Sequence, residues 1–485
     1  MTFLDKPRLS ASASLLSLLS LLACGTGCSW SKFGDDADKA PVRSIGAPSG
    51  FDSADFGKSL TPLSSGQGSA AAFIATSIND THMVLVKLDH AGGVSSFPVS
   101  GTALVGTDGS AVTSAAEVPG SAPTTLLLGS PVVRDEFFGR LYTYALPDLS
   151  ALGAAAAKTG TGDGVAMTYL VPALGSADPG LGRGVTTGFL AGVAATPDYV
   201  VGSDNEVAVV VDGVPTTTAV GAISVGACEV AYDNTQDNRY LLHRPLMAAR
   251  LWADPAGATV QQLFVGSTHG TGMGTVSILN VGLDSLGQPV LNCLASVTGA
   301  RPQFGHALAA GDLDGDGAPD FLVVGAPGQQ AFVYLGWNGV PLGTVPTPLA
   351  IAPTPAGVDF GFAVATLNVD GIPGDEVLIS DPRATIGGQV GAGHVLVYKY
   401  NPATATMDPI GEYADRAPDT DANFGYTLNT LNFCRADVAG GAACPAESLS
   451  RLLMVGAANE TFVYFRVGDN IPLQAGQTAA DVRTF

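Results

Sequence analysis

The chain repeats one structural unit along its length, and this repetition limits what it can fold into. Three clear units begin at Phe304-Gly305, Phe360-Gly361 and Phe424-Gly425, so their starts are 56 and 64 residues apart. Each Phe-Gly start is followed by a short alternating segment, a turn, and two apolar segments. Repetition at such a period is typical of propellers and solenoids, in which one unit cannot bury its apolar faces alone.

Four earlier units keep the apolar segments but lose some of the Phe-Gly starts. The first begins at Phe56-Gly57, and the other three are marked by 126–131, 199–202 and 262–266. Seven units in the 412 residues from 56 to 467 average about 59 residues each, which agrees with the two well-defined steps. With 62 Gly, 31 Pro and only 13% charged residues, the composition favours strands and turns over helices.

The fold expected from these units is all-β, a seven-bladed β-propeller of four-stranded antiparallel blades. Radial packing buries both faces of each blade, and closure of the ring leaves only short protected edges. The last blade needs one more strand from an end of the chain. Residues 41–51 and the tail after 467 are both candidates, and we favour the N-terminal segment because much of the tail is polar.

One unit carries a pattern of acidic residues that suits a metal ion. Carboxylates recur at positions 1, 3, 5 and 9 of a short loop, with glycines between them, and position 7 can offer its carbonyl oxygen. Oxygen ligands at this spacing are those that Ca²⁺ prefers, although Asp-Gly pairs also occur in ordinary turns. The predicted ligands are Asp312, Asp314, Asp316, Asp320 and the carbonyl of Ala318.

The segment from Phe304 to Pro327, FGHALAAGDLDGDGAPDFLVVGAP, resembles the FG-GAP repeat of integrin α-subunit β-propellers. The resemblance implies that each repeat forms one blade. It also implies that the acidic loop links the first two strands of its blade and binds Ca²⁺ on one face of the ring.

The next two units depart from this loop. The sixth aligns Asn368, Asp370, Ile372 and Glu376 with the four carboxylates, and Asp375 is a possible substitute ligand. Whether that loop binds a cation stays open. In the seventh unit, Asn432 and Cys434 fall at the first two ligand positions, and we expect a disulfide between Cys434 and Cys444 to close the turn in place of a metal. Cys228 and Cys293 are the natural second pair, although sequence does not fix connectivity.

The N-terminus has the pattern of an export signal. Lys6 and Arg8 precede an apolar run over 13–23, which is too short to span a bilayer. Leu21-Leu22-Ala23-Cys24 resembles a bacterial lipobox, with Cys24 as the lipidated residue; Cys28 is a fallback, and a plain secretory peptide is the alternative. We expect a signal peptide over 1–23, a tether over 24–50, the propeller over 51–467 and a tail over 468–485.

The charge and the motifs also limit the function. A net charge of −21 disfavours a nucleic-acid partner, because phosphate binding needs a basic surface. The glycine-rich stretch after His269 lacks the Lys-Ser/Thr of a phosphate loop, and no nucleophile or metalloprotease motif is present. The six histidines are scattered: His82, His90, His243, His269, His306 and His394. His306 could face the central channel, but a strand histidine with its bonds satisfied is the simpler interpretation.

The leading hypothesis is an exported, calcium-stabilised propeller without catalysis of its own. It would be lipid-anchored at a bacterial outer membrane or cell surface and would bind a protein or glycan ligand, and we expect a monomer. The alternative is a surface polysaccharide-active lyase or hydrolase on the same scaffold, because loops can hold dispersed catalytic residues. A part of an envelope assembly is a third possibility.

Overall fold

The computed structural model describes residues 42–48, 56–63, 70–76, 83–99, 114–119, 125–130, 140–145, 168–170, 182–191, 197–203, 207–211, 224–225, 227–229, 244–252, 260–267, 273–285, 289–299, 301, 303–328, 330–353, 357–415, 417–436, 444–445 and 448–465. The predicted signal peptide, Cys24, Cys28 and the tail after 467 lie outside these residues. No helix of the described part is long and apolar enough to cross a membrane.

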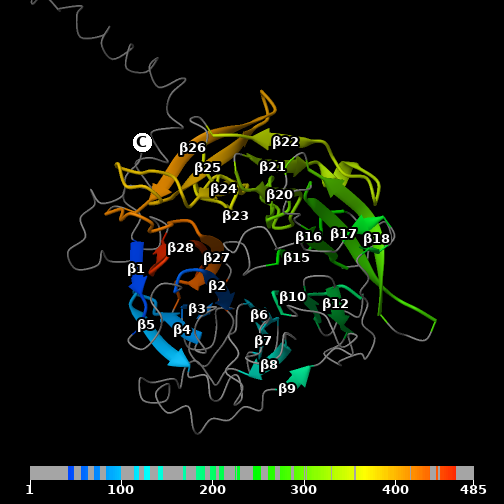
Figure 1. The fold of residues 1–485 in the computed structure, drawn as a ribbon, viewed down its shortest axis with the longest axis horizontal. Helices are drawn as coiled ribbons and strands as arrows, with labels where there is room; N and C mark the ends of the chain where they lie inside the picture. Colours follow the sequence, from blue (N-terminus) through cyan, green and yellow to red (C-terminus); the bar gives the residue numbers. More distant parts are fainter. Residues whose placement is uncertain are drawn as a thin grey trace, which may run out of the picture.

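The described strands form seven antiparallel blades around a ring, as predicted (Figure 1). Blade 1 has β2 (Ser59–Leu63), β3 (Ala71–Thr76), β4 (Met83–Leu88) and β5 (Val94–Val99). Blade 2 has β6 (Ser114–Val118), β7 (Thr125–Ser130), β8 (Arg140–Ala145) and β9 (Thr168–Leu170). Blade 3 shows β10 (Gly184–Gly188), β11 (Asp198–Gly202) and β12 (Val207–Val210) among the described residues, followed by a small hairpin of β13 (Ser224–Val225) and β14 (Cys228–Glu229).

The later blades are the more regular ones. Blade 4 has β15 (Leu246–Ala249), β16 (Gln262–Ser267), β17 (Thr275–Leu283) and β18 (Pro289–Thr298). Blade 5 has β19 (Ala307–Gly311), β20 (Phe321–Ala326), β21 (Gln330–Leu335) and β22 (Pro348–Ile351), with the 3-10 turn η6 (Trp337–Gly339) between the last two. Blade 6 has β23 (Val364–Leu367), β24 (Glu376–Asp381), β25 (His394–Asn401) and β26 (Thr406–Ala414).

The N-terminal segment closes the ring. Blade 7 has β27 (Thr427–Cys434), β28 (Leu449–Gly456) and β29 (Glu460–Tyr464), and its outer strand is β1 (Val42–Gly46). β1 pairs with β29 in antiparallel register from Val42 opposite Tyr464 to Gly46 opposite Glu460. This confirms the N-terminal closure that we favoured. It also places a strand of the propeller inside residues 24–50, the stretch assigned to the tether.

The apolar cores lie between blades. The described residues form seven clusters of buried side chains, and each cluster joins two neighbouring blades, including blades 7 and 1 across the closure. Full burial of one such side chain stabilises the fold by roughly 1.5–3 kcal/mol. The stability of the ring is therefore spread over its blade interfaces, which is why one blade alone could not fold.

The Phe-Gly pairs form the joints between these blades. Phe56, Phe304, Phe360 and Phe424 are all fully buried in interblade clusters. The glycine that follows Phe360 has φ +94° and lies against the backbone of blade 5 at Gln330 and Ala326. Only a glycine combines this left-handed conformation with such a close approach.

Hydroxyl groups add a second link between the innermost strands. Thr427 donates to the carbonyl of Lys58 at 2.7 Å, Thr61 to that of Ala115 at 3.1 Å, and Thr366 to that of Ala310 at 2.7 Å. Each bond joins the first strand of one blade to the first strand of its neighbour or, for Lys58, to the residue just before it. The three carbonyls are thereby satisfied.

Candidate functional site

The acidic loop of blade 5 links β19 to β20 and brings three of its carboxylates together. Asp312, Asp314 and Asp320 each place one carboxylate oxygen within 4.8 Å of the other two. Asp316 is not part of this group, and its Oδ1 accepts the N–H of Ala318 at 2.8 Å. The structure thus gathers three of the five predicted ligands.

The loop backbone wraps around these side chains. The two carboxylate oxygens of Asp312 accept the N–H groups of Gly315 and Gly317, both at 2.6 Å, and Asp320 Oδ1 accepts that of Leu313 at 2.8 Å. Gly315 and Gly317 have φ of +81° and +89°, which explains the two glycines between the acids. The repeated Asp-Gly spacing therefore encodes the loop conformation as well as its charge.

The electrostatics of the loop favour a cation. Burial raises the pKa of the Asp320 carboxyl, the N–H of Leu313 opposes this rise, and the neighbouring loop carboxylates add to it. The three gathered carboxylates therefore repel one another, and a positive ion among them would remove that repulsion.

The donor set fits Ca²⁺. Its oxygen ligands lie at about 2.3–2.6 Å, so two ligands of one ion are at most about 5 Å apart, which agrees with the observed grouping. Asp314 is exposed and Asp312 is half-buried, so the loop is open to solvent on its outer side. These three residues would hold the ion, and the ion would fix the β19–β20 turn.

The corresponding loop of blade 6 has the same backbone bonds but a different centre. Val369 N–H donates to Glu376 Oε2, Gly371 N–H to Asn368 Oδ1, and Ile372 N–H to Asp370 Oδ1, each at 2.8 Å. The Lys399 ammonium from β25 donates to the carboxylates of Asp370 and Glu376, to the latter at 2.8 Å. The cation beside these acids is thus a side chain of the protein.

Asp375, the predicted substitute ligand, is turned to other partners. Its carboxylate lies 3.2 Å from Arg451 Nη1 and accepts the N–H of Asp312 at 3.3 Å. Arg451 belongs to β28, so this carboxylate connects the loops of blades 5 and 6 to blade 7.

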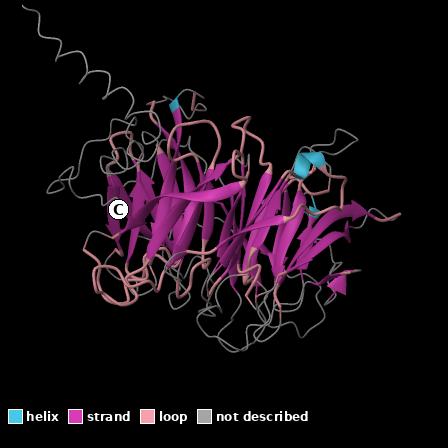
Figure 2. Ribbon diagram, turned by 90° about the horizontal axis from the view of Figure 1, so that it is seen from above, coloured by secondary structure: helices cyan, strands magenta, loops and turns pink. Residues whose placement is uncertain are grey.

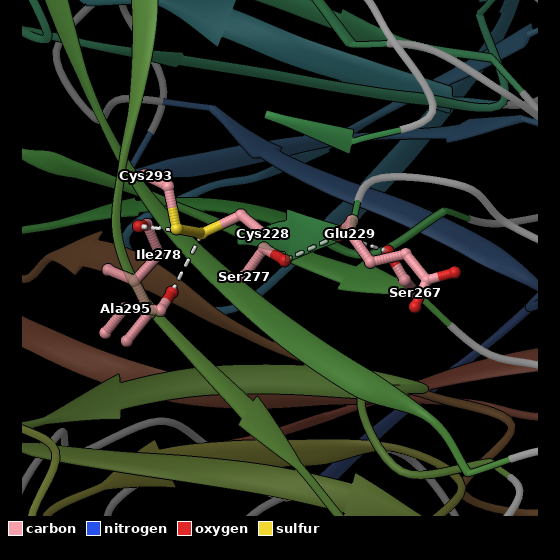
Figure 3. Close-up of a disulfide and its surroundings, with 7 residues drawn as sticks. All are labelled: Cys228, Glu229, Ser267, Ser277, Ile278, Cys293 and Ala295. Atoms are coloured by element: carbon pink, nitrogen blue, oxygen red, sulfur yellow. Dashed lines mark hydrogen bonds between the residues drawn. A yellow bond between two sulfur atoms is a disulfide. The ribbon is translucent and has the colours of Figure 1, made fainter. Parts of the chain in front are cut away.

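Both predicted disulfides are formed. Cys434 and Cys444 are joined within the β27–β28 connection, the place that the metal loop takes in blade 5. Cys228 is joined to Cys293, which attaches the β13–β14 hairpin to the outer strand of blade 4 (Figure 3). Beside it, the carbonyl of Glu229 accepts the hydroxyls of Ser267 at 3.1 Å and Ser277 at 2.5 Å. The hairpin is therefore held by a covalent bond and by hydrogen bonds.

A central channel of about 480 Å³ runs between the innermost strands of all seven blades. The acidic loops of blades 5 and 6 follow these strands, whereas the Phe-Gly pairs precede them, so the two features mark opposite faces of the ring. Figure 2 shows these faces as the two ends of the strands. η6 follows the end of β21 and therefore lies on the same face as the acidic loops. The opposite mouth of the channel is formed by the residues that follow the Phe-Gly pairs.

These mouth residues form a continuous arc over four blades. The rings of His306 and Phe362 are 4.9 Å apart, those of Phe362 and Tyr426 are also 4.9 Å apart, and the Lys58 ammonium lies 5.7 Å from the centre of the Tyr426 ring. All four line the channel. His306 is 8% exposed, so it is a packed histidine just before β19 and also part of the channel wall. Of the other histidines, His82, His243 and His269 lie outside the described residues.

The sequence reasoning missed two parts of these sites. One is Lys399, which could have been found by comparing Val397-Tyr398-Lys399 in blade 6 with Val333-Tyr334-Leu335 in blade 5. The other is Arg183. Its backbone N–H donates to the carbonyl of Gly202 at 3.1 Å, just as the backbone N–H of His306 donates to the carbonyl of Gly325 at 3.2 Å. Gly182-Arg183 is therefore the counterpart of Gly305-His306 and marks the start of blade 3, where the sequence has no Phe-Gly pair.

Comparison with known proteins agrees with the repeat. Residues 304–339, which span the first three strands of blade 5 and its loop, match the family model of the FG-GAP repeat. The chain matches no curated protein. The chain is a seven-bladed β-propeller whose fifth blade matches the FG-GAP repeat, a fold that suits a binding module.

Proposed function

We propose that this chain is a binding or adhesion module displayed on a bacterial envelope. It would be exported, anchored by a lipid at Cys24, stabilised by Ca²⁺ at the loop of blade 5, and monomeric, with no catalysis of its own. Its ligand would be a protein or a glycan of a cell surface. The observation that carries the proposal is an FG-GAP blade in a closed ring whose channel mouth presents aromatic and cationic side chains.

The mouth is the surface where we place the ligand. Aromatic side chains supply rigid contact area, and the ammonium of Lys58 supplies a charge-assisted hydrogen bond, so the arc combines features of binding hot spots. The four residues of the arc lie one or two positions before the first strands of their blades, so these strands fix where the arc stands.

Binding to isolated cell envelopes tests this placement. We expect Tyr426→Ala and Lys58→Gln to weaken binding about tenfold or more, the size expected when an anchor residue is lost. Leu342 is exposed on the opposite face of the ring, where the acidic loops lie. Leu342→Ser is therefore the matched control and should bind as the wild type does. If both mouth variants bind normally, the ligand site is elsewhere.

Treatment of the envelopes identifies the kind of ligand. Loss of binding after periodate oxidation indicates a glycan, and loss after protease treatment indicates a protein. New reducing or unsaturated ends produced by repurified wild-type protein would contradict a purely binding role.

Fractionation tests the anchor separately. Cys24→Ser should move the mature protein from the membrane fraction to the soluble fraction, while Cys28→Ser should leave it with the membranes. A Cys24→Ser protein that stays with the membranes would show that the anchor is not at this residue.

A further inference from the structure

The acidic loop of blade 6 contains a positive charge supplied by the chain itself. Lys399 Nζ donates to Asp370 Oδ2 and, at 2.8 Å, to Glu376 Oε1. The side chain of Glu376 is 1% exposed and that of Asp370 is 14% exposed. A carboxylate as buried as that of Glu376 needs a positive partner.

The loops of blades 5 and 6 have the same conformation around their acids. In both loops, the acid at the ninth position (Asp320 or Glu376) accepts the backbone N–H of the second loop residue. The side chain at the first position (Asp312 or Asn368) accepts the backbone N–H of the fourth loop residue. The third-position carboxylate accepts the N–H two residues on in both cases. These three matching bonds mean that Asp370 and Glu376 occupy the places of Asp314 and Asp320.

Strand register shows which residue of blade 5 corresponds to Lys399. Gly311 and Leu367, the residues just before the two loops, are opposite Phe321 and Glu376. Phe321 pairs on its other side with Leu335, and the pairing of Val377 with Tyr398 puts Glu376 opposite Lys399. At this position, blade 6 has an ammonium group and blade 5 has the apolar side chain of Leu335.

The number of acidic side chains in the two loops agrees with the presence of the lysine in blade 6 alone. Blade 5 has aspartates at all four side-chain positions, whereas blade 6 keeps only Asp370 and Glu376, with Asn368 and Ile372 at the others. A single ammonium can balance much of this smaller charge. The loop with more acids is the one without a lysine.

We propose that Lys399 is a tethered cation that replaces the metal ion in the loop of blade 6, and that removal of its ammonium turns this loop into a divalent-cation site. The loop of blade 6 is therefore insensitive to chelators in the wild-type chain. This inference does not depend on which ligand the propeller binds.

The number of Ca²⁺ ions bound per chain tests the proposal in a variant whose acidic loop in blade 5 is disabled by Asp314→Ala. Equilibrium dialysis would use about 10 mM Ca²⁺, tenfold above the weakest common extracellular modules. The Asp314→Ala chain should bind no Ca²⁺. The Asp314→Ala, Lys399→Met chain should bind one ion, and adding Glu376→Gln to these two changes should abolish that binding. If Lys399→Met folds and binds no ion, the lysine is an ordinary ion-pair partner and the proposal is wrong.

The reciprocal exchange in blade 5 tests the proposal without disturbing Lys399. Leu335 is partly buried, so Leu335→Met, which has a side chain of similar length without the charge, serves as the control for loss of the leucine. We expect Leu335→Lys to weaken Ca²⁺ binding by the otherwise wild-type chain at least tenfold relative to Leu335→Met. Equal binding by the two variants would contradict the proposal, and this comparison decides the matter if Lys399→Met does not fold.

Discussion

Asp312 and Asp375 are joined by two hydrogen bonds between the loops of blades 5 and 6. The N–H of Asp375 donates to the carbonyl oxygen of Asp312 at 2.6 Å, and the N–H of Asp312 donates to Asp375 Oδ2 at 3.3 Å. Arg451 of blade 7 lies against the same carboxylate. The first predicted metal ligand is thus held by a chain of contacts that crosses three blades.

Arg451→Met should loosen this chain of contacts. The Asp375 side chain is 7% exposed and would lose its positive partner, while the 41% exposure of Arg451 reduces the effect. We expect a loss of about 1–3 kcal/mol in the free energy of unfolding, below the 3–5 kcal/mol typical of a fully buried pair. Denaturant unfolding measures it. In a double-mutant cycle with Asp375→Asn, additive effects would show that the two side chains do not interact.

Removal of calcium should lower the stability of the wild-type chain. At tenfold excess over its dissociation constant, one ion adds about 1.4 kcal/mol. Thermal unfolding with Ca²⁺ or EDTA should therefore differ by about 1–2 °C, because the unfolding entropy of so long a chain is large. Asp314→Ala should abolish this difference and, in EDTA, should be at least as stable as the wild type because one repelling charge is gone. An unchanged calcium response in Asp314→Ala would disprove the loop assignment.

The glycine of the Phe-Gly pair can be tested against a glycine of equal backbone conformation. Gly361 and Gly388 have φ of +94° and +89°, but only the first has neighbouring backbone where a Cβ would stand. Gly388→Ala should cost about 1 kcal/mol for its conformation alone. Gly361→Ala should cost a further 1–3 kcal/mol or so for crowding against blade 5. Equal losses would mean that the close approach between blades does not matter.

The two disulfides should contribute unequally to stability. They close loops with sequence separations of 65 residues for Cys228–Cys293 and 10 residues for Cys434–Cys444. Chain entropy assigns about 4 kcal/mol to the longer loop and about 3 kcal/mol to the shorter one. Paired Cys→Ser variants, compared by chemical denaturation, should therefore be less stable when Cys228 and Cys293 are replaced. The opposite order would show that strain or residual structure outweighs loop length.

The seven-bladed ring and the acidic loop of blade 5 could be predicted from the sequence because both depend on local sequence patterns. The Phe-Gly starts and the apolar segments recur at nearly constant spacing, and the acids of the fifth loop recur at every second residue. The same patterns located Cys434–Cys444, which occupies the turn where the metal residues were missing.

The remaining features depend on residues that are distant in sequence. Lys399 reaches Asp370 across 29 residues, and Arg451 reaches Asp375 across 76 residues. The arc at the channel mouth joins Lys58 to Tyr426 only because β1 closes the ring. Strand register brings such pairs together, and register requires the assembled fold.

The position of bound ions in a crystal tests the central claim most directly. An anomalous difference map from crystals soaked in Tb³⁺, which substitutes for Ca²⁺, should show a peak among Asp312, Asp314 and Asp320. The map should show no peak between Asp370 and Glu376, where density for Lys399 is expected instead. A peak in the loop of blade 6, or no peak in the acidic loop of blade 5, would contradict the account.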